Sequence, residues 1–83
     1  MLNENVNPYK CLEQVELHIG QHKSLGHKLN TAIVDACTRI VQDHLVELNR
    51  AIKFGSFGND VTIALQETMK NMQGRLDRAL ARI

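Results

Sequence analysis

The chain has 83 residues and a formal net charge of +1; 43% of its residues are hydrophobic and 23% are charged, which is too apolar for an intrinsically disordered chain. Because positive and negative residues alternate along the whole chain, no basic surface is expected that would bind nucleic acid through its phosphates. No run of about 18 apolar residues predicts a membrane span, and the polar opening MLNENVNPYK lacks the features of a signal peptide, so we expect a cytoplasmic protein.

A short helix is predicted near the beginning of the chain. Residues 1–6 show no periodicity and are expected to form a frayed tail. Asn7 can cap a first turn, and Pro8 suits the first helical position, where its missing N–H is no loss. Gly20 disfavours a helix interior by about 1 kcal/mol relative to Ala. We therefore predict a first helix over about residues 8–20, ending between Gly20 and Ser24, with a kinked continuation into the second helix as the alternative.

The longest helical pattern covers residues 30–53, with Asn30 and Thr31 as suitable N-caps. Its apolar residues follow two lines with a period of 3.6 and cover about half of the circumference, more than the roughly 100° stripe of a surface helix. The second of these lines consists of Val34, Val41, Leu45, Leu48 and Ile52. So wide an apolar arc predicts two neighbouring helices, with part of the arc left for a second copy or another protein.

A turn and a third helix complete the chain. The segment KFGSFGND, residues 53–60, interrupts the helical pattern. Its aromatic residues Phe54 and Phe57 are expected to fold back over the end of the bundle, or alternatively to form an exposed docking knob. Apolar residues then repeat at alternating spacings of four and three over about residues 60–83, namely Leu65, Met69, Met72, Leu76, Ala79 and Ile83. This narrow seam requires one partner, which predicts an antiparallel hairpin with the central helix.

Together these elements predict one all-α domain over residues 1–83. It is a small helical bundle made of a long antiparallel hairpin, about 30–53 and 60–83, and a shorter N-terminal helix, about 8–20. Cys11 and Cys37 are interpreted as reduced, partly buried apolar residues. The alternative, for an exported protein, is a disulfide that joins the first two helices.

Residues that could support catalysis or metal binding form no specific motif. His18 and His22 have the i, i+4 spacing of two metal ligands, but the Glu of an HExxH motif is missing, and we interpret these two and His27 as surface residues. His44 is expected to be partly buried and hydrogen-bonded to a carbonyl or carboxylate. No phosphate-binding glycine loop is present. We therefore predict neither an enzyme nor a metal or cofactor site.

The leading functional hypothesis is a small helical protein–protein interaction module: a chaperone, adaptor, inhibitor or regulatory subunit. It would act through apolar helix faces and self-associate as a homodimer. The predicted partner-binding residues are Val34, Val41, Leu45, Leu48, Ile52, Phe54, Phe57, Met69 and Met72.

Arg75, Arg78 and Arg82 form a C-terminal Arg line beside the seam of the last helix. Cations suit a helix C-terminus, where the backbone dipole is negative, and this is the preferred interpretation. The alternative is a patch for an acidic partner or for phosphates, which would make the protein a small dimeric nucleic-acid-binding regulator. A histidine metal site is a third hypothesis.

Overall fold

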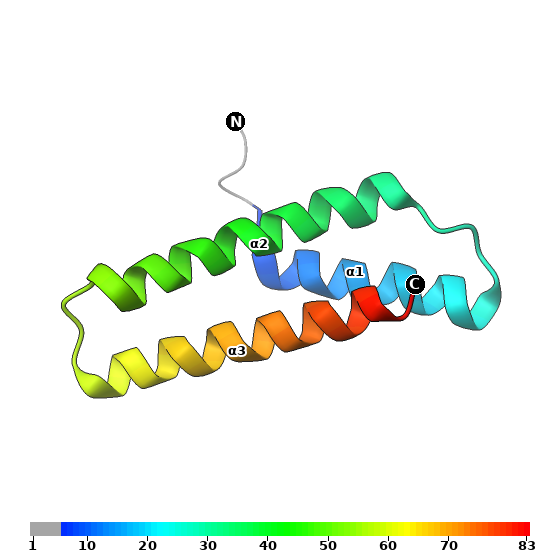
Figure 1. Ribbon diagram of the computed structural model, residues 1–83. Coiled ribbons are helices and arrows are strands. Elements are labelled where there is room, and N and C mark those ends of the chain that lie inside the picture. Colours follow the sequence, from blue (N-terminus) through cyan, green and yellow to red (C-terminus); the bar gives the residue numbers. More distant parts are fainter. Residues whose placement is uncertain (1–5) are drawn as a thin grey trace.

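The computed structural model describes residues 6–83 and contains three helices (Figure 1). Helix α1 spans Pro8–Leu25, α2 spans Thr31–Phe54 and α3 spans Asn59–Ala81. Each helix packs against both others, and α2 and α3 run antiparallel, which confirms the predicted all-α bundle. Of the predicted frayed tail, residues 1–5 lie outside the described part of the chain. Within residues 6–83, no helix is both long enough and apolar enough to cross a bilayer.

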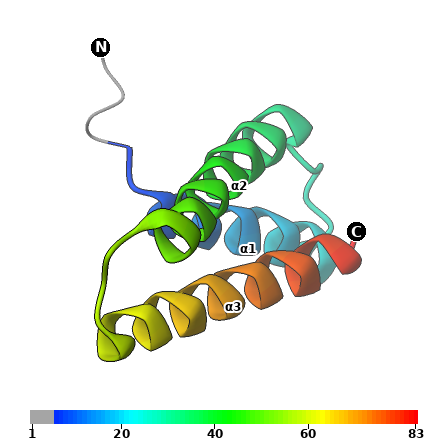
Figure 2. The same ribbon diagram turned by 60° about the vertical axis from the view of Figure 1, so that its left-hand side comes forward.

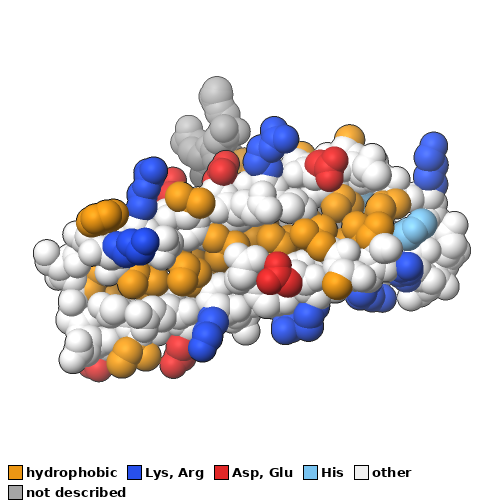
Figure 3. Space-filling view, in the orientation of Figure 1, with side chains coloured by type: hydrophobic (Ala, Val, Ile, Leu, Met, Phe, Trp, Pro, Cys, Tyr) orange, Lys and Arg blue, Asp and Glu red, His pale blue; other side chains and the backbone are white. Residues whose placement is uncertain are grey.

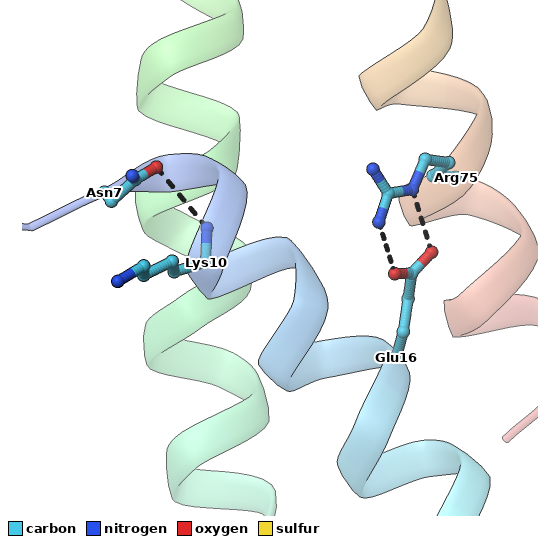
Figure 4. A network of polar contacts seen from close by, with 4 residues as sticks. All are labelled: Asn7, Lys10, Glu16 and Arg75. Carbon is cyan, nitrogen blue, oxygen red and sulfur yellow. Dashed lines mark hydrogen bonds and ion pairs between the residues drawn. The ribbon is translucent and has the colours of Figure 1, made fainter.

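Helix α1 begins as the sequence predicts. The Oδ1 atom of Asn7 accepts hydrogen bonds from the backbone N–H groups of Tyr9 and Lys10, at 2.9 and 3.4 Å. Figure 4 shows the second of these bonds. They satisfy two of the backbone donors that have no partner within the first turn of a helix.

The end of α1 differs from the prediction, because Gly20 lies inside the helix and the helix ends at Gly26. Gly26 adopts a φ of 70°, in the left-handed region that closes many helices and that side chains with a Cβ disfavour. The ring of His22 donates a hydrogen bond from Nδ1 to the carbonyl oxygen of His27, at 2.7 Å. The packing of the buried Ile19 outweighs the weak helix propensity of the glycine that follows it.

The hydrophobic core occupies only one end of the hairpin. The last buried residue of α2 is Leu45, and the first buried residue of α3 is Met72. Figures 1 and 2 show the cause: α1 lies against the start of α2 and the end of α3 and does not reach the turn at residues 55–58. We call the uncovered part of the hairpin, residues 46–54 and 59–69, the open half. The buried core consists of Leu12, Val15, Ile19, Val34, Val41, Leu45, Met72, Leu76 and Ala79.

The contribution of α1 to this core can be measured with two identical substitutions in the same helix. Leu12 is 0% exposed and Leu17 is 48% exposed. We expect Leu12→Ala to lower the free energy of unfolding by about 3 kcal/mol, because it leaves a cavity, and Leu17→Ala to lower it by less than about 1 kcal/mol. Urea denaturation of both variants tests this. Equal effects would contradict the placement of α1.

Two glycines six positions apart test where α1 ends. Gly20→Ala adds a methyl group whose nearest neighbour, outside the helix's own nearby backbone, is Nη1 of Arg82 at 4.0 Å. We expect it to raise the free energy of unfolding by about 0.5–1 kcal/mol, because Ala favours a helix interior. Gly26→Ala should lower it by about 1 kcal/mol, because of the positive φ. If thermal unfolding shows the same sign for both, the helix does not end at Gly26.

Candidate interaction surface

Four of the predicted partner-binding residues belong to the core of a single chain. They are 0–7% exposed and pack in the cluster that α1 covers. Their prediction as partner-binding residues is therefore corrected, because a buried side chain cannot contact a partner while the chain stays folded. The buried residues of α1 in this cluster are Leu12, Val15 and Ile19. These four residues are Val34, Val41, Leu45 and Met72.

The remaining predicted residues lie in the open half and the adjacent turn. Leu48, Ile52 and Met69 are half-buried. Phe54 is 81% exposed, so it does not fold back over the end of the bundle as predicted. The ring of Phe57 lies against Gly55 and leaves no room there for a Cβ atom. Both aromatic rings therefore stay outside the buried core.

A groove lies between α2 and α3. It has a volume of about 480 Å³, and its apolar walls come from Leu45, Val46 and Met69. The other lining residues are Gln42, Asn49, Lys70 and Gln73, so only one of the seven carries a charge. In Figure 3 hydrophobic side chains form a band between α2 and α3, with charged side chains on either side. The arrangement suits an apolar side chain of a partner helix.

Several exposed apolar side chains belong to the open half and its turn. Val46, Val61 and Ile63 are 53%, 47% and 52% exposed, and the two Phe residues join them. Single exposed apolar residues are normal on a protein surface, and these five all belong to the part of the hairpin that α1 leaves uncovered. The open half therefore has exposed apolar side chains, and the groove lies at its boundary, where it contributes Val46, Asn49 and Met69 to the lining.

The C-terminal Arg line is partly engaged within the chain. Arg75 donates from Nε to Oε2 of Glu16 at 3.0 Å and from Nη2 to Oε1 at 2.6 Å (Figure 4). These hydrogen bonds, despite some desolvation, lower the pKa of the Glu16 carboxyl and raise the pKa of Arg75. Arg82 lies beside Gly20 of α1, and Arg78 is exposed. The prediction of Arg75 as an anion-binding residue is corrected, because its charge is matched by a carboxylate 59 positions away in sequence.

The environment of His44 agrees with the prediction only in part. His44 is half-buried, and its ring meets the ring of Tyr9 edge-on at 5.8 Å. Its Nε2 atom is buried without a hydrogen-bond partner among the described residues, so the predicted bond is not found at that atom. Within residues 6–83, no three His, Cys, Asp or Glu side chains are grouped closely enough to hold a metal ion.

No known protein family, curated protein or solved structure matches this chain. The function must therefore be inferred from the residues themselves.

The ion pair between α1 and α3 makes stability depend on pH. Because the folded-state pKa of Glu16 is lowered, the pair stabilises the fold above the ordinary Glu pKa and is lost as pH falls through the lowered value. A double-mutant cycle with Glu16→Gln and Arg75→Gln should give a coupling of about 0.5–1 kcal/mol at neutral pH, since both side chains are about one-third exposed. This coupling should decrease as pH falls below the ordinary Glu pKa and vanish once the Glu16 carboxyl is protonated.

The exposed Glu67 on α3 provides the matched control for that cycle. Glu67→Gln combined with Arg75→Gln should give no coupling in the same denaturation experiment. Equal coupling for both pairs would show that the effect reflects general charge balance and not the contact with Glu16.

Proposed function

We propose that this chain is a small helical protein–protein interaction module that acts by binding rather than by catalysis, and that its partner is a second copy of itself. The main support for the proposal is that the buried core of the hairpin ends where α1 ceases to cover it. Buried side chains stop on α2 at Leu45 and begin on α3 at Met72, where the cover provided by α1 ends. Beyond that point the hairpin has an apolar face, and residues 6–83 provide no third helix to cover it.

The dimensions of the chain support association. Its radius of gyration is 14.5 Å, whereas a compact domain of this length has about 12 Å. The molecule measures 47 × 30 × 14 Å. A flat shape of this kind leaves more surface exposed to solvent than a sphere of the same volume would. Small domains are already marginally stable for this reason, and a second copy would cover the exposed apolar area.

A second copy also has the right shape to fill the open half. Two helical hairpins that pack face to face form a four-helix bundle, in which each hairpin supplies the neighbours that the other lacks. Here the open halves, residues 46–54 and 59–69, would form such a bundle about a two-fold axis. In this arrangement Leu48, Ile52 and Met69 would complete their burial.

The charge of the surface is compatible with a two-fold axis. In an interface of this symmetry the same patch meets itself, so a strongly charged patch would repel its copy. The groove carries three amide side chains and a single cation, Lys70.

Binding to nucleic acid is less favoured, because Glu16 matches the charge of Arg75 in the C-terminal Arg line.

The molar mass in solution tests the proposal. Light scattering over a wide range of concentrations should approach twice the 9.4 kDa mass of one chain. Val46→Glu places a charge in the groove at a residue that is already 53% exposed, so it should retain the helical circular dichroism of the monomer and weaken dimerisation at least about tenfold.

The matched control is Leu25→Glu, at an apolar residue that is 64% exposed at the end of α1 and outside the groove. It should dimerise like the unmodified chain. A chain that remains monomeric at the highest concentration reached, or a Leu25→Glu variant that dissociates as readily as Val46→Glu, would overturn the proposal.

A further inference from the structure

The two cysteines of the chain meet at the interface between α1 and α2. Cys11 belongs to α1 and Cys37 to α2, and these two helices pack against each other. Both side chains are half-buried and contact the same hydrophobic core. Both are free thiols. The fold has therefore brought together two groups that are 26 positions apart in sequence.

The contact between Tyr9 and His44 supports this alignment of the two helices. Their rings lie 5.8 Å apart, and α1 and α2 run antiparallel. Helical side chains lean toward the N-terminus of their own helix, so contacting rings on antiparallel helices come from Cα atoms that are offset along the axis. At about 1.5 Å per residue, an offset of about 7–8 Å places Cys11, two residues after Tyr9, level with Cys37, seven residues before His44.

The spacing of packed helices suits a disulfide. Helix axes lie about 8–10 Å apart and Cα atoms about 2.3 Å from each axis, so directly facing Cα atoms approach to roughly 3.5–5.5 Å. Disulfides require Cα atoms about 4.4–6.8 Å apart, a range that slightly oblique facing positions reach. The thiols also influence each other: burial raises the pKa of Cys11, and the charge and hydrogen bonding of Cys37 raise this pKa further.

We propose that Cys11 and Cys37 are a redox site: they form a reversible disulfide that clasps α1 to α2, by exchange with a small-molecule disulfide such as oxidised glutathione. The bond would close a loop that includes all of the α1–α2 connection and would hold α1 over the core. The proposal concerns contacts within one chain and does not depend on self-association.

The exchange proceeds in two balanced steps. One cysteine loses its proton, and its thiolate attacks a sulfur of oxidised glutathione, forming a mixed disulfide and releasing one glutathione thiolate. The second cysteine loses its proton and attacks the protein sulfur of the mixed disulfide, which releases the second glutathione thiolate. The two protons pass to the two glutathione thiolates. The chain loses two electrons and two protons, and one oxidised glutathione becomes two reduced molecules.

Intact-mass measurement after alkylation tests the proposal. Dilute folded protein is incubated with excess oxidised glutathione, quenched with a thiol-alkylating reagent in denaturant, and weighed. The expected product is about 2 Da lighter than the reduced chain and carries no alkyl group or glutathione. It should return to the reduced mass with dithiothreitol, and its melting temperature should exceed that of the reduced chain by roughly 10 °C.

Two controls separate proximity in the fold from general thiol reactivity. Cys11→Ser and Cys37→Ser should each stop at the glutathione adduct. The unmodified chain in concentrated urea should close its disulfide at least about tenfold more slowly than the folded chain, because the fold no longer holds the thiols together. Accumulation of adducts or linked dimers by the folded chain, or closure at equal rates with and without urea, would overturn the proposal.

Discussion

The structure depends on a mismatch of length between the helix that needs covering and the helix that covers it. At 1.5 Å per residue, the 24 residues of α2 extend about 36 Å, whereas the 18 residues of α1 extend about 27 Å. The apolar arc of α2 therefore has two neighbours over only part of its length. Burial of Val34, Val41 and Leu45 stabilises one end of the hairpin. Toward the other end of α2, Leu48 and Ile52 are only half-buried.

The position of α1 accounts for both proposals. Its capped start at Asn7 and its end at Gly26 set its extent, and the paired Glu16 and Arg75 connect it to α3. Because α1 stops short of the turn at residues 55–58, the open half remains exposed. Because α1 packs on the first part of α2, its only cysteine comes to lie beside the cysteine of α2. The proposed association surface and the proposed redox site thus both depend on the placement of one helix.

Much of the fold could be predicted from local chemistry, since helix periodicity, caps and breakers act over a few residues. The starts of α1 and α2 agree with the predicted caps at Asn7 and Asn30, whose side chains accept the expected backbone hydrogen bonds. The site was harder to predict. An apolar residue such as Val41 satisfies the same periodicity whether its neighbour is α1 or another molecule, so it was predicted to bind a partner but lies in the core of the chain. Phe54 was expected near the core but is exposed.

The sequence by itself determined that the chain forms three helices, that α2 and α3 pair as a hairpin and that α2 is apolar around too much of its surface for one neighbour. These properties arise from spacings within single helices and from one short turn. Only the tertiary structure decided which parts of the arc α1 buries, that Arg75 pairs with Glu16 and that Cys11 meets Cys37. The contacts of Cys11 with Cys37 and of Glu16 with Arg75 join residues that are 26 and 59 positions apart in sequence. They depend on the axial alignment of packed helices, which no local pattern encodes.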